Sequence, residues 1–182
     1  SGTLTVSTAQ ATGRVISGAG GVTVNALAAD ANLSSVSASG TVTANVADNL
    51  DYSANTNIAT VDAFVIAANK TGSFSAAQGA KTITLGSGSI AKVIAASDIS
   101  GTTLNGSVTK IDVSDNATAS LSAAQAQLDI TLGSSAVAKV KVSGNDDISG
   151  LTFDANVTAI EVAANKTATL SVAHGQLTIT LG

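Results

Sequence analysis

The chain has 182 residues, of which 45% are apolar, 11% are charged and 2% are aromatic, and its net charge is -4 at pH 7. The apolar content argues against intrinsic disorder, and the negative charge opposes nucleic-acid binding, which needs a basic face to neutralise phosphate. The absence of cysteine excludes disulfide bonds, thiolate zinc sites and a thiol nucleophile. No apolar run approaches the roughly 18 residues that a membrane span needs, so we expect no transmembrane segment.

The kinds of apolar residue indicate an all-β protein. They are mostly Ala, Val, Leu and Ile, and the chain has three Phe, one Tyr and no Trp. Small and β-branched side chains fill a narrow interior and favour strands. Proline, which would remove a hydrogen bond from a strand ladder, is absent.

Along the chain, a short strand pattern with apolar residues at its first, fourth and sixth positions begins near residues 15, 33, 61, 90, 108, 137 and 157. Three of these starts, at Val61, Val108 and Val157, open long segments that align from end to end without a gap. The aligned segments are "VDAFVIAANKTGSFSAAQGAKTITLG", "VTKIDVSDNATASLSAAQAQLDITLG" and "VTAIEVAANKTATLSVAHGQLTITLG". Strands that recur at such intervals are typical of a solenoid, in which each coil stacks on the one before.

We therefore predict a parallel β-solenoid in which coils of about 28 and about 19 residues alternate. The prediction treats residues 1–182 as one array: a partial repeat over 1–14, a divergent repeat over 15–60, repeats over 61–107 and 108–156, and a partial repeat over 157–182. Both ends fall within a repeat and show no polar capping coil, so we expect either self-association or stacking on neighbouring repeats of the same protein.

Two local features of the long coils carry predictions about turns. The strings "SAAQ" and "SVAH" place a serine before Ala-Ala-Gln or Val-Ala-His, and they predict either one helical turn capped by that serine or a bend between strands. Glycine follows each "ITLG" strand at Gly86, Gly133 and Gly182, where we expect it to supply a positive φ at a coil corner.

Two resemblances follow from these strings. "VTKIDVSDN", "VAKVKVSGN" and "VTAIEVAAN" resemble the strand motif of leucine-rich repeats. In that family the asparagine forms an internal ladder at the turn, which implies such a role for Asn116, Asn145 and Asn165. The whole repeat, with "LSAAQ" after a polar turn, resembles the β-strand repeats of large secreted or cell-surface bacterial proteins, which implies an extracellular or cell-surface location.

The only histidine, His174, lies in a repeat column that holds Gln78 and Gln125, with Asp48 in the divergent repeat. A column of interchangeable polar residues is typical of a solvent-facing corner, so we predict a surface position. Proton transfer or metal binding needs partner residues, and neither a second histidine nor a G-x-S-x-G nucleophile motif is present. We therefore expect no catalytic residues and no enzymatic activity.

Two groups of residues remain as candidate sites. The acidic turns offer calcium candidates in Asp98, Asn145, Asp146 and Asp147, since calcium takes oxygen ligands, although Asx turns explain the same residues. No other cofactor is expected. Sequons at Asn32, Asn69, Asn105, Asn116, Asn156 and Asn165 are candidates for glycosylation, and three of them, Asn69, Asn116 and Asn165, share one repeat column.

These features favour a structural role. The leading hypothesis is a repeat module of a bacterial extracellular or cell-surface protein, serving as a stalk, adhesin shaft, surface-layer or filament element that assembles by coil stacking. The alternative is a module that binds a glycan, calcium or ice through a regular Thr/Ser/Asn face. A polysaccharide-cleaving solenoid ranks last, because it needs a groove of carboxylates with basic residues and the only arginine is Arg14.

Overall fold

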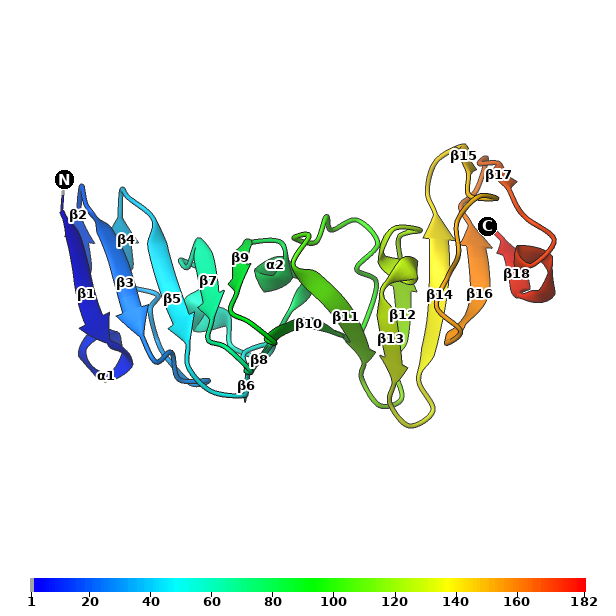
Figure 1. The fold of residues 1–182 in the computed structure, drawn as a ribbon. Helices are drawn as coiled ribbons and strands as arrows, with labels where there is room; N and C mark the ends of the chain where they lie inside the picture. The colour runs from blue at the N-terminus through cyan, green and yellow to red at the C-terminus, as the bar shows by residue number, and fades with distance from the viewer. Residues whose placement is uncertain (1) are drawn as a thin grey trace. The chain divides into compact units, whose positions relative to one another are not determined.

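A computed structural model describes residues 2–182, which form two compact units. Of the described residues, unit 1 comprises 2–93 and 104–109, and unit 2 comprises 94–103 and 110–182. In each unit short parallel strands stack coil upon coil (Figure 1). The prediction of an all-β parallel solenoid is confirmed.

Unit 1 contains one five-stranded parallel sheet, made of every second strand in chain order (Figure 1). This sheet contains β1 (Thr3–Ser7), β3 (Gly21–Asn25), β5 (Val42–Val46), β7 (Ala63–Ile66) and β9 (Thr82–Leu85). Shorter pairings form the other faces of the coils, and they join β2 (Ile16–Gly18) to β4 (Val36–Ala38) and β8 (Thr71–Phe74) to both β6 (Leu50–Asp51) and β10 (Ile90–Ala95).

Unit 2 repeats this arrangement with a second parallel sheet. Its strands are β12 (Thr118–Leu121), β14 (Val137–Val142), β16 (Val157–Val162) and β18 (Thr178–Leu181). Further pairs join β11 (Val108–Val113) to β13 (Asp129–Leu132) and β15 (Asp146–Asp147) to β17 (Ala168–Thr169).

The strand register corrects the predicted length of the long coils. Ala63 of β7 pairs directly with Thr82 of β9. The "TITLG" strand is therefore the next rung above "VDAFVI" and not a second side of the same coil. The other registers have similar spacings, from the closely spaced pair Thr3 and Gly21 to the wider pair Leu50 and Gly72. The coils are therefore nearly equal in length, and the predicted alternation of long and short coils is wrong.

The core lies inside the coils and follows the alternation of the strands. In β5, β10 and β14, alternate residues are buried, and they are mostly Val and Ala. Phe64 and Phe74 are fully buried. Their ring centroids lie 4.8 Å apart, and Tyr52 stacks on Phe74 at 5.8 Å. This aromatic cluster fills part of the interior of unit 1, whereas small aliphatic side chains fill most of the remaining core.

The "SAAQ" strings form helical turns, which decides between the two predicted conformations. Residues Ala76–Gly79 form the α-helical turn α2, and overlapping positions of the other two copies form the 3-10 turns η2 (Gln125–Gln127) and η3 (His174–Gln176). An additional copy of the turn, α1 (Thr8–Ala11), begins at "STAQ" within the stretch interpreted as a partial repeat. A fifth turn, η1 (Thr56–Ile58), precedes β7.

The turn glycines act differently from the prediction. The residues with positive φ in the turns after β7, β11 and β16 are Asn69, Asn116 and Asn165, with φ of 58°, 56° and 60°. Asparagine tolerates this left-handed conformation better than most residues. Gly86 is instead required by close approach, because a Cβ there would lie 2.6 Å from the backbone nitrogen of Ala68.

Candidate functional site

Each helical turn of the "SAAQ" type is closed by a reciprocal pair of hydrogen bonds between the first and fourth residues of its string. In α2, the Ser75 backbone N–H donates to Gln78 Oε1 at 2.9 Å, and the Gln78 backbone N–H donates to Ser75 Oγ at 3.3 Å. Ser122 and Gln125 form the same pair at 2.8 and 3.2 Å. This capping box satisfies backbone donors that the short turn leaves open, so it fixes the direction of the glutamine side chain.

The glutamine side chain then reaches back to an earlier coil. Gln78 Nε2 donates to the carbonyls of Tyr52, at 3.0 Å, and Asn55, at 2.8 Å. We call this unit, a capping box whose fourth side chain also binds the backbone of an earlier coil, a coil clamp. In unit 2, Gln125 Nε2 donates to the carbonyls of Ile99, at 3.0 Å, and Thr102, at 2.7 Å. The two glutamines are only 8% and 4% exposed.

The structure corrects the prediction for His174, which is 5% exposed and does not occupy a solvent-facing corner. Its Nδ1 accepts from the backbone N–H of Ser171 at 3.4 Å, and its Nε2 lies 3.1 Å from the carbonyl of Leu151. Since Nδ1 accepts, the tautomer that fits this network carries its proton on Nε2, which then donates to the carbonyl of Leu151. The Phe153 ring stacks on the imidazole at 4.5 Å. His174 therefore forms a coil clamp with one carbonyl where glutamine binds two.

The spacing between the serine and the glutamine or histidine in these strings explains why Gln78, Gln125 and His174 are buried. A serine followed three residues later by Gln is the signature of a capping box, and that signature predicts a side chain folded back onto the backbone. Asp48, aligned with the column by its apolar spacing, lies exposed outside any helical turn. The alignment is therefore wrong at Asp48, and interchange of Gln and His reflects a shared hydrogen-bonding role.

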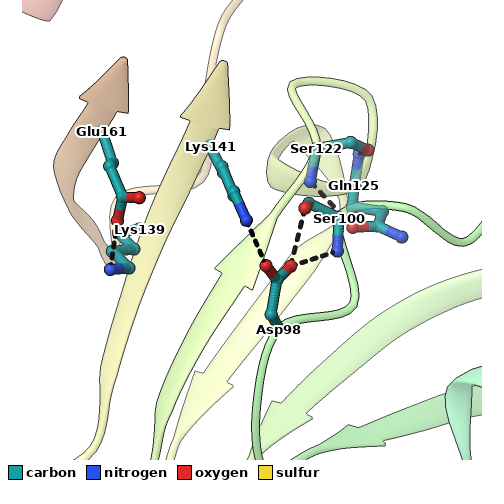
Figure 2. A network of polar contacts seen from close by, with 7 residues as sticks. All are labelled: Asp98, Ser100, Ser122, Gln125, Lys139, Lys141 and Glu161. Carbon is teal, nitrogen blue, oxygen red and sulfur yellow. Dashed lines mark hydrogen bonds and ion pairs between the residues drawn. The ribbon is translucent and has the colours of Figure 1, made fainter. Parts of the chain in front are cut away.

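The calcium candidate Asp98 is engaged by protein groups (Figure 2). Lys141 Nζ donates to its Oδ2 at 2.6 Å, and Ser100 donates to its Oδ1 from both Oγ, at 2.6 Å, and the backbone N–H, at 2.9 Å. These hydrogen bonds, with that of Lys141 the largest cause, lower the pKa of Asp98 to about 2. The carboxylate is thus a fixed anion that joins separate coils of unit 2.

The other calcium candidates lie in the β14–β16 connection. Asp147 Oδ1 accepts from the backbone N–H of Ser149, at 3.0 Å, and from its Oγ, at 2.6 Å, which is an Asx turn and holds the pKa of Asp147 below its usual value. Asn145 Oδ1 accepts from the backbone N–H of Thr167 at 2.9 Å, and Asp146 lies in β15, exposed. Within residues 2–182 no group of three or more His, Cys, Asp or Glu side chains is placed to hold a metal ion.

The predicted asparagine ladder is not internal. Asn116 and Asn165 lie exposed at left-handed turn positions, and Asn145 is also exposed although its side chain binds the next coil. The internal ladder implied by the leucine-rich-repeat resemblance is therefore wrong for these residues, since an internal ladder needs buried side chains. The sequon column Asn69, Asn116 and Asn165 is exposed, and its glycosylation stays a prediction.

Ion pairs between coils line the surface of unit 2. Lys139 pairs with Glu161 across β14 and β16, as Figure 2 shows, and Lys110 pairs with Asp129 across β11 and β13. The hydrogen-bonded partner carboxylate raises the pKa of Lys110, as Asp98 does for Lys141. Solvent screens exposed pairs of this kind, so they help to define the strand register more than they stabilise the fold.

Comparison with protein-family models, with characterised proteins and with solved structures finds no match to this chain. The fold and its coil clamps define the class: a β-solenoid repeat protein. None of the helices in the described part of the chain has the length and hydrophobicity that membrane crossing requires.

Proposed function

We propose that the chain is a structural module of a bacterial extracellular or cell-surface protein, forming part of a stalk, adhesin shaft, surface layer or filament that assembles by coil stacking. The observation that carries this proposal is the coil clamp. Its buried polar side chains are directed to the backbone of an earlier coil, as in Gln78 and Gln125. Because these polar groups bind the chain's own backbone, they stabilise the stacking of the coils, which supports a structural role.

The hydrogen bonds along the coils support a mechanical role. Parallel ladders, coil clamps and ion pairs such as Lys139–Glu161 all join residues about one coil apart, so load along the coils is shared by many bonds. The resemblance of the repeat to those of large bacterial surface proteins supports the proposed location. We expect neither an enzymatic activity nor a nucleic-acid partner.

Electron microscopy of the purified chain tests the assembly. Fibres or ordered layers that grow with protein concentration are expected, and immunogold labelling of intact cells that produce the protein is expected to mark their surface. Particles that remain single and compact at every concentration, together with label confined to the cell interior, would contradict the proposal.

One observation favours a second candidate function, a ligand-binding face. Thr5, Thr23 and Thr43 lie in register on three successive rungs of unit 1, and Thr5 is exposed. A column of hydroxyls at the strand spacing of about 4.8 Å suits a periodic ligand such as a glycan or ice. The column ends at Ala63 on the next rung, so the structural role is preferred. Saturable binding in a glycan array or an ice-recrystallisation assay, lost in Thr23→Val, would favour the second candidate.

A further inference from the structure

One asparagine of the chain is followed directly by glycine, at Asn105–Gly106. Asn105 Oδ1 accepts a hydrogen bond from the Ser107 backbone N–H at 3.0 Å, which closes an Asx turn. The ring that this hydrogen bond closes contains both the side-chain carbon Cγ of Asn105 and the backbone nitrogen of Gly106. The turn therefore limits how far this amide carbon and this nitrogen can move apart.

The backbone nitrogen of Gly106 is accessible. Gly106 is exposed, and a Cβ placed on it would meet nothing within 4 Å. No group within residues 2–182 accepts a hydrogen bond from its backbone N–H. Glycine also has no side chain that shields this nitrogen or restricts the backbone, so the nitrogen is free to react with the Asn105 side chain.

Two other asparagines, Asn32 and Asn55, form the same kind of turn without this combination. After Asn32 comes Leu33, which is fully buried and donates its backbone N–H to the carbonyl of Asn57 at 3.0 Å. Asn55 precedes the β-branched Thr56, and its own Nδ2 donates to two carbonyls of an earlier coil, each at 2.9 Å. In these two turns the fold holds either the backbone nitrogen or the side-chain amide, which it does not do at Asn105–Gly106.

We propose that Asn105 is a site of spontaneous deamidation. The Gly106 nitrogen gives its proton to solvent base and attacks Asn105 Cγ, so that a nitrogen–carbon bond forms. The Ser107 N–H already binds Oδ1 and stabilises the negative charge that develops there. The Cγ–Nδ2 bond then breaks, Nδ2 takes a proton from solvent and leaves as ammonia, and a cyclic imide remains. Water opens this imide at either of its two carbonyls, which gives aspartate or isoaspartate.

The isoaspartate product disturbs the contact between this turn and the first repeat copy. The Asn105 backbone N–H donates to the carbonyl of Gly79 at 2.8 Å, and Ser107 Oγ donates to the carbonyl of Ile83 at 2.8 Å. Isoaspartate adds one methylene to the backbone between these two donors. Both donors then cannot stay in register with their carbonyls, so deamidation to isoaspartate loosens the turn from the coil that it covers.

The aspartate product fits the fold, because the second repeat copy already has an aspartate in the equivalent position. The two segments align without a gap as "ISGTTLNGSV" (residues 99–108) and "ISGLTFDANV" (residues 148–157). The Asp154 backbone N–H donates to the carbonyl of Ala126 at 2.8 Å, and Asp154 Oδ1 accepts from the Asn156 N–H at 2.8 Å. These are the contacts of the asparagine turn, so only the isoaspartate product is expected to change the structure.

Peptide mapping by mass spectrometry tests the site on the full chain, incubated in mildly alkaline buffer. We expect Asn105 to be converted roughly tenfold faster than Asn116 and Asn165, because glycine leaves the attacking nitrogen unshielded. Asn116 and Asn165 are exposed at left-handed turn positions, and they precede Ala117 and Lys166, which carry a Cβ. Fragmentation by electron transfer distinguishes the aspartate product from the isoaspartate product.

Gly106→Ala is the matched variant, because the added Cβ has room and the fold is kept while the nitrogen is shielded. Conversion of Asn105 is expected to fall roughly tenfold in this variant. Asn105→Asp carries the aspartate product from the start, and its amide exchange in residues 105–108 is expected to match that of the unmodified chain. The isoaspartate fraction of the aged chain is expected to exchange faster there.

Conversion of Asn105 no faster than that of Asn116, or unchanged in Gly106→Ala, overturns the deamidation site. Equal amide exchange in the isoaspartate fraction and in Asn105→Asp overturns the effect assigned to the added methylene.

Discussion

Replacing Gln125 by leucine removes the coil clamp of the second copy while keeping the side chain's approximate size. The change eliminates three hydrogen bonds, one accepted from Ser122 and two donated to Ile99 and Thr102. Each such bond contributes about 1 kcal/mol net, and a buried group left without a partner costs about 1–3 kcal/mol more. The carbonyl of Ile99 keeps a partner, because it still accepts from the Thr102 N–H at 2.9 Å. We therefore count mainly the three lost bonds and expect the free energy of unfolding to fall by roughly 3 kcal/mol.

Urea denaturation followed by far-ultraviolet circular dichroism measures this loss, and native-state amide exchange localises it. Gln127→Leu is the matched control, because Gln127 is exposed in the same turn and its side chain donates only locally, to Ala123. A double variant with Ser122→Ala tests whether the clamp acts as a unit: the second change should then add little. If Gln125→Leu lowers the unfolding free energy no more than Gln127→Leu does, the burial and bonding assigned to the column are wrong.

Three further outcomes follow from the same contacts. His174→Gln should stabilise unit 2 by about 1 kcal/mol in urea denaturation, because a second donor can reach the carbonyl of Ile148, which is equivalent to that of Ile99; a destabilised variant would contradict the clamp geometry. The pKa of Asp98 is about 2 when folded and 3.8 ordinarily, so its contribution, roughly 0.5 kcal/mol for an exposed pair, is complete above pH 4 and is lost as pH falls toward 2. Asp98→Asn should flatten that part of the stability–pH curve, and an unchanged curve would refute the assignment. Gly86→Ala should cost about 1–3 kcal/mol through backbone overlap, while Gly101→Ala, which meets nothing within 4 Å, should not.

The solenoid could be predicted from sequence because coil stacking imposes a period on apolar residues. Alternate positions in strands such as β14 are buried and must stay apolar, so their spacing is recognisable even where the other residues of the repeats differ. The coil length could not be predicted in the same way. β7 and β9 belong to one sequence copy yet are neighbouring rungs, and only strand register reveals which apolar segments stack.

The coil clamp shows why site prediction failed at one column and how it could succeed. The burial of Gln78 depends on the carbonyls of Tyr52 and Asn55 in an earlier coil, which no local pattern encodes. The capping-box spacing from Ser75 to Gln78, repeated at Ser7 and Gln10, is nevertheless visible in the sequence. It indicates a turn in which the polar side chain has a fixed direction. For predicting whether such a side chain is buried, this spacing is a better guide than its polarity alone.

The aromatic cluster of unit 1 gives the chain a built-in optical reporter. Tyr52 is the only tyrosine and tryptophan is absent, so intrinsic ultraviolet fluorescence beyond that of phenylalanine arises from unit 1 alone. Its hydroxyl donates to the carbonyl of Leu27 at 2.8 Å, and burial, with a smaller effect from Asp48, raises the pKa of the phenol above its usual value. The rate at which phenolate absorbance appears in alkaline solution therefore reports the unfolding of unit 1. Unit 2 contains no tyrosine or tryptophan, so it can be followed independently through a tryptophan introduced at an exposed position.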